Sequence, residues 1–294
     1  MVLFALLPNI VAAQGKRATA KKGAFTPRPP VEAALQSGVT VGTGEAFGRV
    51  TVFPIYSVVQ RDAGEFVSLE QALRAKTAEV REKSDGASVN ELTIENKGKT
   101  NILVLAGTVI KGGNQDRQIG QDFIISAKKT VPIDAFCVEH GRWEGAREGQ
   151  ATGGKFQVVS GLAPTTVRAA GQYKENQGQV WDAVAKVNAE NRSSSESDTL
   201  IATLDNPRIV AQRKTLVRKI KSFLDARTPQ NNVVGLAWAI DGEVRAVRWF
   251  MNHKIWSMYQ GALSDVAALE ALTTKKRGKP KAVGPQAIIA FVKE

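Results

Sequence analysis

The first half of the chain contains runs that are rich in β-branched and aromatic residues, which are typical of β-strands. The clearest run is 49–56, Arg-Val-Thr-Val-Phe-Pro-Ile-Tyr. Glycine-containing turns at 85–86, 97–99 and 112–113 separate the strands. Because a parallel crossover needs about a dozen residues or more, these short connections predict antiparallel neighbours. Further strands are expected over 78–83, 90–96, 101–111, 122–126 and 130–139.

The second half changes to the periodicity of amphipathic helices. Residues 179–190 and 207–225 each place apolar residues on one face, and 252–272 predicts a last helix. Asn206 is a suitable N-cap for the second of these helices, and Pro207 takes the favoured first position. The other face of this helix is basic, and we expect solvent to cover it; its residues are Arg208, Arg213, Lys214, Arg218, Lys219 and Lys221.

Two short motifs predict where a helix begins and where two strands are joined by a turn. Ser68 and Gln71 match a capping box, with the serine at the N-cap and the glutamine three residues on, so a short helix is expected to follow. Strands over 233–240 and 243–250 are joined by an Asp-Gly turn at 241–242. This dipeptide tolerates the positive φ angles that a type I′ turn requires, and it therefore predicts a hairpin.

The order of strands followed by helices, without an internal repeat, predicts an α+β fold. An antiparallel, strand-rich N-terminal half is expected to pack with helices and a β-hairpin from the C-terminal half. We expect a single domain over 39–274, a basic flexible linker over 14–38 and a basic tail over 275–294. Residues 1–13 are expected to form a separate segment that resembles a signal peptide.

The basic residues are concentrated at the two ends of the chain. Lys and Arg number 40 against 28 Asp and Glu, a formal charge of +12. Residues 1–30 carry five basic residues and no acid, and residues 275–294 carry a net charge of +5. Because a nucleic-acid-binding domain groups its cations on one folded face, we predict no specific nucleic-acid partner. The basic tails are expected to make weak contacts with anionic surfaces.

Composition excludes several classes of protein and site. Hydrophobic residues make up 43% and charged residues 23% of the chain, which excludes collagen-like, disordered and multi-span membrane proteins. One cysteine and two histidines exclude a disulfide framework, a multi-cysteine zinc module and a His-rich metal site. No pattern of residues identifies a cofactor.

Residues 3–13 resemble the apolar core of a signal peptide. A membrane span needs about 20 apolar residues, whereas a signal core needs only about 7–15 before small residues at the cleavage site. Ala12 and Ala13 supply such residues before Gln14. We therefore expect an extracytoplasmic protein, periplasmic or secreted, with no transmembrane span in its mature chain. The alternative interpretation is a buried N-terminal strand.

The densest polar grouping lies in two segments, 112–118 and 137–143, that follow strand ends. A double glycine permits a tight turn and lets backbone N–H groups converge on an anion. The arginines offer forked donors that suit phosphate or carboxylate. We therefore predict a site for an anionic small molecule, formed by Gly112, Gly113, Gln115, Asp116, Arg117, Glu139 and Arg142.

Other interpretations of the same segments stay open. Cys137 has the chemistry of a nucleophile, but a buried structural cysteine is expected because strand alternation points His140 to the other face. Glu139 suits either a general base or a structural carboxylate paired with arginine. We assign no catalytic residue. No closely spaced His/Cys pair exists, so no metal site is predicted.

These segments also carry a resemblance to a known family. Residues 104–117, 131–133 and 137–143 resemble the domain associated with ADP-ribosylglycohydrolases, rhodaneses and phosphatases, the ARPP-type domain. The most specific features are the paired Gly-Gly-x-Gln-Asp-Arg and Cys-x-Glu-x-Gly-Arg-Trp motifs. The resemblance implies a link to ADP-ribose or another nucleotide-derived ligand. It brings no established catalytic residues.

Two functional hypotheses follow. The first is an exported, small-ligand-binding domain, with hydrolysis as an extension, whose site lies at the strand ends that bear the predicted arginines and carboxylates. The second is a non-catalytic extracytoplasmic interaction module in which the same residues form a structural polar network. A concave pocket containing both arginines would support the first hypothesis. Buried side chains that pair with one another would support the second.

Overall fold

The computed structural model describes residues 31–82, 91–142, 144–147, 150–227, 232–276 and 281–293. They form two compact units, whereas the sequence predicts one domain over 39–274. Unit 1 draws its described residues from Met1–Ala63, Ser222–Ser257 and Lys279–Glu294. Unit 2 draws them from Gly64–Lys221 and Met258–Gly278. The division arises because strands near the N-terminus pair with the hairpin far along the chain, so unit 2 is inserted between segments of unit 1.

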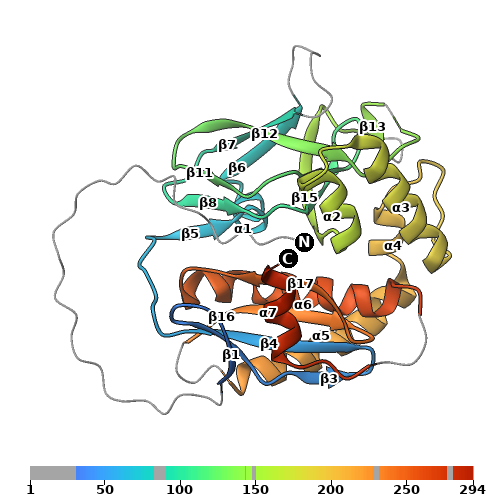
Figure 1. Cartoon of the computed structure of the whole chain (residues 1–294). Helices are drawn as coiled ribbons and strands as arrows, with labels where there is room; N and C mark the ends of the chain where they lie inside the picture. The colour runs from blue at the N-terminus through green and yellow to red at the C-terminus, as the bar shows by residue number, and fades with distance from the viewer. Residues whose placement is uncertain are drawn as a thin grey trace. The chain divides into compact units, whose positions relative to one another are not determined.

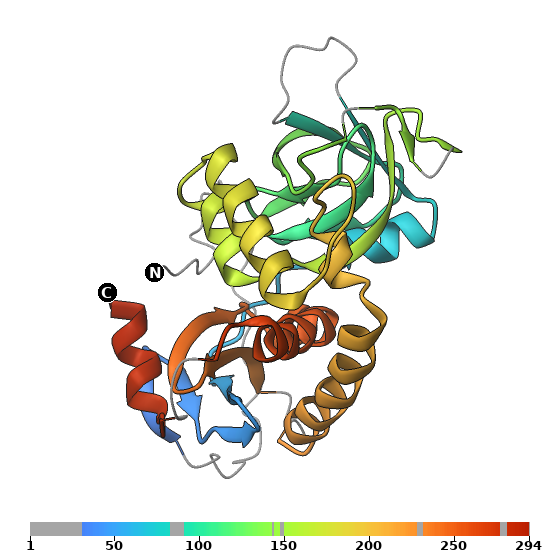
Figure 2. The ribbon, with the colours of Figure 1, turned by 90° about the vertical axis from the view of Figure 1, so that its right-hand side faces the viewer.

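Unit 1 is built on an antiparallel sheet with strand order β1-β2-β4-β16-β17, and β3 also pairs with β4. Helix α7 packs against β1, β2 and β17, and Figure 2 shows this red helix beside the blue strands. The core of the unit includes Phe53, Ile55 and Val234 from the sheet and Ile288 and Ile289 from α7. The bounds are β1 Val31–Gln36, β2 Val39–Gly42, β3 Glu45–Phe47, β4 Val50–Ser57, β16 Val233–Ile240, β17 Glu243–Trp249 and α7 Pro285–Lys293.

Both expected flanking segments need correction where the structure describes them. Strand β1 begins at Val31, inside the expected linker 14–38, because its residues pair with β2. Helix α7 lies inside the expected tail 275–294, because the apolar run 287–292 gives this helix a buried face. The basic residues that precede the run led to the interpretation of the whole segment as a tail. Residues 1–30, including the signal-peptide-like segment, lie outside the described residues.

The predicted hairpin of unit 1 is confirmed. Asp241 and Gly242 have φ angles of 53° and 87°, as a type I′ turn requires. Arg49 holds the turn through its Nε, 3.1 Å from Asp241 Oδ1, and through Nη2, 2.5 Å from Oδ2. This contact joins the start of β4 to the turn between β16 and β17, which is distant in the sequence.

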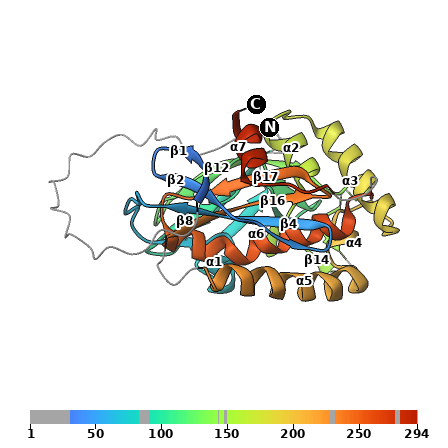
Figure 3. The same ribbon diagram turned by 60° about the horizontal axis from the view of Figure 1, so that its bottom comes forward.

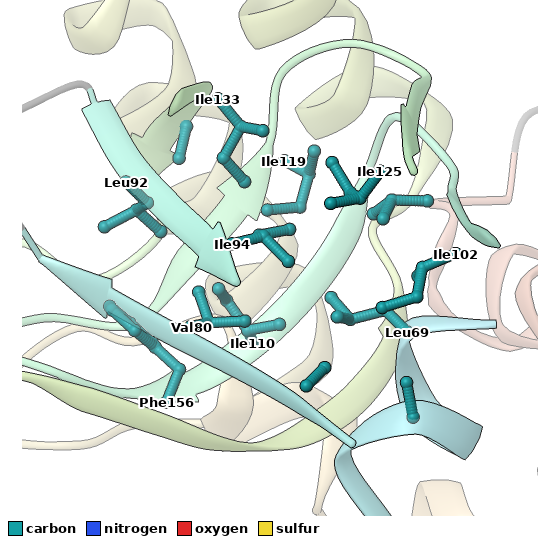
Figure 4. Close-up of a cluster of buried hydrophobic side chains, with 14 residues drawn as sticks. Leu69, Val80, Leu92, Ile94, Ile102, Ile110, Ile119, Ile125, Ile133 and Phe156 are labelled. Atoms are coloured by element: carbon teal, nitrogen blue, oxygen red, sulfur yellow. The ribbon is translucent and has the colours of Figure 1, made fainter. Parts of the chain in front are cut away.

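Unit 2 contains a closed barrel with strand order β10-β12-β7-β6-β15-β9 (Figure 1). Neighbouring strands in it are antiparallel, as the short connections predict. Apolar side chains fill its interior, and Figure 4 shows Val80, Ile94, Ile110 and Phe156 converging there. The bounds are β6 Ala78–Glu82, β7 Glu91–Asn96, β9 Thr108–Gly112, β10 Arg117–Ile119, β12 Thr130–Cys137 and β15 Lys155–Leu162.

Shorter strands flank the barrel. The strand expected over 101–111 is two strands, because the chain turns at Gly107, whose φ is +85°. Its first part, β8, pairs with β11 antiparallel and with β5 parallel. The bounds are β5 Phe66–Ser68, β8 Asn101–Val104, β11 Phe123–Ile125, β13 Ala146–Arg147 and β14 Gln150–Ala151.

Helices complete unit 2. The predicted capping box is present at α1, where Ser68 Oγ accepts from Gln71 N at 3.2 Å and Gln71 Oε1 accepts from Ser68 N at 2.8 Å. Helices α2 and α3 lie beside the barrel in Figure 2 and contribute to a second core with Val109 and Leu269. The bounds are α1 Leu69–Arg74, α2 Thr165–Gln172, α3 Gln177–Asn191 and α4 Ile201–Leu204. Two longer helices, α5 Pro207–Asp225 and α6 His253–Thr273, have most of their residues in unit 2 and the rest in unit 1.

The fold class is α+β, as the sequence predicts. Figure 3 shows α5 and α6 running alongside each other, and an ion pair between their unit 2 residues joins them. Among the helices in the described part of the chain, none combines the length and the apolar character that a membrane span requires.

Candidate functional site

The structure brings the predicted polar residues together at one end of the barrel. Strand β9 ends at Gly112, β10 begins at Arg117, and Arg117 lies opposite Cys137 at the end of β12. Antiparallel pairing therefore places the turn 113–116 next to the segment that carries Glu139 and Arg142. We call this group the barrel-end cluster; it comprises Gly112, Gly113, Gln115, Asp116, Arg117, Glu139 and Arg142.

Arg142 binds protein groups through all of its guanidinium nitrogens. Its Nε lies 3.0 Å from Glu139 Oε1 and its Nη2 lies 2.8 Å from Oε2. The same side chain donates to two backbone carbonyls of the glycine turn, with Nη2 3.2 Å from Gly112 O and Nη1 2.8 Å from Gly113 O. Only 12% of the side chain is exposed. Arg142 therefore stabilises the turn from within the protein.

Asp116 connects three parts of the fold. Its Oδ1 accepts from Gly112 N at 3.1 Å, and its Oδ2 accepts from the hydroxyl of Thr199 at 2.8 Å. Its own N–H donates to Glu139 Oε2 at 2.8 Å. The side chain is fully buried. Each of its carboxylate oxygens therefore already accepts a hydrogen bond from the protein.

The electrostatics of Glu139 follow from the same contacts. Burial alone would raise the pKa of its carboxyl. Hydrogen bonds from the side chains of Arg142 and Ser197 and from Asp116 N together outweigh burial and hold the pKa below its usual value. Glu139 is therefore an ionised, buried acceptor, which differs from the raised pKa of a general base poised near neutrality.

Arg117 lies among the inward-facing residues of the barrel and is 1% exposed. Its Nη1 lies 3.3 Å from both the backbone O and the side-chain Oε1 of Gln115, and its Nη2 lies 3.6 Å from Glu82 Oε1. Across the strand pair lies Cys137, which is fully buried, and this burial raises the pKa of its thiol. A neutral, inaccessible thiol fits the structural interpretation of this cysteine.

The two glycines are required by the turn. Gly112 has a φ of +142°, and a Cβ placed on it would lie 2.4 Å from Lys155 O. Gly113 has a φ of +52°, and a Cβ there would lie 2.4 Å from the ring of Phe156. Side chains would therefore clash with β15 at both positions. The double glycine lets β9 and β15 approach each other; in this structure its two carbonyls accept from Arg142.

The arrangement of the barrel-end cluster is that of a buried polar network. Its charged side chains contact one another, backbone groups and the side chain of Gln115, and two further partners, Glu82 and Thr199, lie outside the cluster. Within the part of the chain that the structure describes, no three His, Cys, Asp or Glu side chains gather in a way that could hold a metal ion.

A cavity lies elsewhere in unit 2 and contains none of the cluster residues. Its volume is about 420 Å³, within the range of small-molecule sites. Its walls come from α1, β9, β15, α5 and α6. Polar side chains on these walls include Glu70, Ser160, Arg213, Tyr259 and Asp265.

An arginine–carboxylate pair lies on the wall of this cavity. Arg213 Nε on α5 lies 3.1 Å from Asp265 Oδ1 on α6. Burial raises the pKa of Asp265, and the positive charge of Arg213 opposes that rise. Among the described residues, Arg213 Nη1 is buried and has no hydrogen-bond partner. The pair therefore retains hydrogen-bonding capacity that the protein itself does not use.

Strand β15 is irregular where it lines the cavity. In the ladder of β15 with β9, Val159 faces Ile110 and Gly161 faces Val109, so Ser160 is the extra residue of a β-bulge. Gly161 has a φ of +123°, and a Cβ on it would lie 3.9 Å from Asp265 Oδ2. Bulges are over-represented beside functional sites because they redirect a side chain or backbone group.

Reasoning from the sequence missed this second group. Arg213 is expected from the sequence to be on the solvated basic face of its helix, but its side chain is only 12% exposed and pairs with Asp265. That expectation is wrong because the helix turns Arg213 toward α6, a long-range contact that helical periodicity alone does not show. Asp265, an acid within the mostly apolar run 262–269, is a signal in the sequence that could have indicated the pair.

Comparison with known proteins identifies a family. The family model ARPP-1, described as the ARG and Rhodanese-Phosphatase-superfamily-associated Protein domain, matches residues 38–294. The match includes both motif segments of the barrel-end cluster and the walls of the cavity. No curated protein and no solved structure was found to match the chain.

Proposed function

The chain belongs to the ARPP-1 family, and we propose that it is a small-ligand-binding protein whose ligand occupies the cavity of unit 2. The observation that carries this proposal is the Arg213–Asp265 pair on the wall of a cavity of about 420 Å³. Binding sites are typically apolar hollows with a few convergent polar groups. In this proposal the barrel-end cluster stabilises the barrel and does not bind the ligand.

Charge and hydrogen bonding distinguish the two groups of residues. At the barrel end, Arg142 donates to the carboxylate of Glu139 and to several backbone carbonyls. A ligand there would have to displace these partners. At the cavity, Arg213 pairs with Asp265, and its Nη1 has no partner among the described residues. The side chain of Asp265 is 34% exposed, so a ligand could reach its carboxylate without breaking the pair.

The same pair suggests a place for chemistry. A carboxyl beside a cavity whose pKa is raised by burial is a candidate for proton exchange with a substrate. If the protein is hydrolytic, we assign proton transfer to Asp265 rather than to Glu139, whose pKa is lowered. A nucleotide-derived compound such as ADP-ribose is one candidate ligand that the family resemblance suggests.

Location is a further part of the proposal. The apolar segment 3–13, which ends in small residues, supports export and an extracytoplasmic site of action. The alternative function, a non-catalytic interaction module, is supported by the burial and mutual pairing of the barrel-end cluster. The two functions differ in whether the cavity binds a small molecule.

A thermal-shift screen of nucleotides, nucleosides, sugars, amino acids and organic anions tests the proposal on the purified protein. A ligand at 100 times its dissociation constant adds about 2.7 kcal/mol of stability. The site is tested with Gly261, which lines the cavity and where an added Cβ would have no neighbouring atom within 4 Å. Gly261→Trp should block the cavity, and Gly261→Ala is its matched control.

We expect a hit that stabilises wild type and Gly261→Ala but not Gly261→Trp. Gly261→Ala alone should be neutral or slightly stabilising, because alanine is preferred to glycine within a helix by about 0.5–1 kcal/mol. If no compound stabilises the wild type, or if Gly261→Trp responds as strongly as the control, the proposal is wrong. The interaction-module alternative would then be preferred.

A further inference from the structure

We infer that the cavity of unit 2 selects a neutral polyhydroxylated ligand, such as a sugar or cyclic polyol, with the Arg213–Asp265 pair binding two neighbouring hydroxyl groups. This inference rests on the proposed function and names the ligand class of that site. Its basis is the balance of charge on the cavity wall, the hydrogen-bonding character of the ion pair and the apolar remainder of the lining.

The charges that line the cavity are balanced in pairs. Asp265 is paired with Arg213, and Glu70 is paired with Arg74, whose Nη2 lies 2.7 Å from Glu70 Oε1. Because each carboxylate has a cationic partner, neither an anion nor a cation would find an uncompensated charge in the cavity. A neutral ligand needs no such charge, and it leaves the ion pairs in place.

The ion pair presents an acceptor beside a donor. A carboxylate only accepts hydrogen bonds and a guanidinium only donates them, whereas a hydroxyl group does both. Asp265 Oδ1 accepts from Arg213 Nε, and Oδ2 lies toward Gly161, where a Cβ would come within 3.9 Å of it. One ligand hydroxyl can donate to Oδ2 while its neighbour accepts from the guanidinium. Two adjacent hydroxyl groups match this pattern.

The rest of the lining suits the carbon face of such a molecule. Leu69, Val159, Leu162 and Met258 provide apolar contacts. Tyr259 contributes its ring, because its hydroxyl already donates to Leu103 O. Ser160, the extra residue of the β-bulge, adds a hydroxyl that can donate or accept. A ring with hydroxyl groups at its edge and C–H groups on its face satisfies both parts of the lining.

Binding by named probes tests the inference. Ribose, glucose and myo-inositol represent the neutral polyols, inorganic phosphate represents anions, and alanine represents zwitterions. Each is titrated into the full-length protein by calorimetry, alongside its effect on the melting temperature. We expect at least one polyol to bind, and phosphate and alanine to bind at least about 10-fold more weakly or not at all, since one mismatched charged contact changes affinity by that factor.

Variants then locate the contact. Asp265→Asn keeps the shape but replaces one acceptor oxygen by a donor, so polyol affinity should fall about 10-fold or more. Ser160→Ala should weaken polyol binding by a smaller factor. This second variant still tests the contact if Asp265→Asn does not fold. Asp182→Asn, an exposed acid on α3, is the matched control and should bind as wild type does.

The outcomes separate the inference from the proposed function. If phosphate or alanine binds in the cavity and no polyol does, the ligand class is wrong but the cavity is still a binding site. If a polyol binds equally well to wild type, Asp265→Asn and Ser160→Ala, the inferred diol contact is wrong. If no compound of any class binds, the proposed function fails first, and this inference fails with it.

Discussion

Arg142 and Glu139 form a two-point ion pair, with Nε 3.0 Å from Oε1 and Nη2 2.8 Å from Oε2. Glu139 is only 1% exposed, so this pair is largely removed from water. Removing one partner of such a pair leaves a buried charge without compensation, which costs far more than losing a surface ion pair. The barrel-end cluster should therefore behave as part of the barrel's framework.

Arg142→Ala should lower the free energy of unfolding by about 3–5 kcal/mol, because the carboxylate of Glu139 would stay buried without its guanidinium partner. Chemical denaturation followed by circular dichroism measures the change. The matched control is Arg218→Ala on the exposed face of α5, which should change stability by no more than about 0.5 kcal/mol. Equal, small effects of the two variants would contradict the structural assignment.

Glu139 should make stability depend on pH in the acid range. Its folded-state pKa is lowered from the ordinary value of 4.5, so its contribution is present above that value and is lost as pH falls through the folded-state pKa. Glu139→Gln should be less stable at neutral pH, and its stability should fall less steeply below pH 4.5. Unfolding midpoints between pH 7 and about 3 test this.

Asp265 should act in the opposite sense. Its folded-state pKa is raised from 3.8, so its contribution to stability is lost as pH rises through the folded-state value. The comparison of wild type with Asp265→Asn isolates this effect from that of Glu139.

For the Glu139 prediction, the slope of unfolding stability against pH on the acid side is the decisive quantity. A slope that is unchanged in Glu139→Gln would show that other carboxyls dominate the titration.

Helix α7 should be required for the stability of unit 1. Ile288 is fully buried in the core that α7 shares with the sheet. Ile288→Ala should cost about 2–5 kcal/mol, and ending the chain after Gly284 should cost more. Lys293→Ala, near the end of the same helix, is the control and should have little effect. Melting temperatures that match wild type for Ile288→Ala would show that α7 is dispensable.

Export predicts a processed N-terminus. If the segment 3–13 acts as a signal peptide, the mature chain should begin near Gln14. Intact-mass analysis of the protein from fractionated native cells measures this, and replacing Leu6 and Leu7 by Glu should block processing. An unprocessed chain in the cytoplasmic fraction would contradict the proposed location.

Local signals allowed much of the fold to be predicted. The capping box at Ser68, the Asp-Gly hairpin turn and the helix over 207–225 depend on residues close in sequence, and all are present. The barrel could not be predicted in the same way, because its closure depends on β15, which pairs with β9 and β6 from far along the chain. The glycine and polar residues in that strand also weaken its pattern.

The same distinction applies to the site. The motif segments were correctly expected to lie together, because antiparallel strands bring their ends to one edge. Whether their charges face a ligand or one another depends on Asp116 meeting Thr199 and on Arg142 folding back over Gly112, which spacing does not reveal. The pairing of Arg213 with Asp265 likewise depends on how α5 and α6 pack.

Hydrogen–deuterium exchange with and without a bound ligand from the screen tests the central claim most directly, because it locates the site along the chain. We predict slower amide exchange in the cavity walls, at 159–162 and 258–265, and little change at the barrel end. Protection concentrated at 112–117 and 139–142, with no change in the cavity walls, would contradict this prediction and restore the barrel-end cluster as the ligand site.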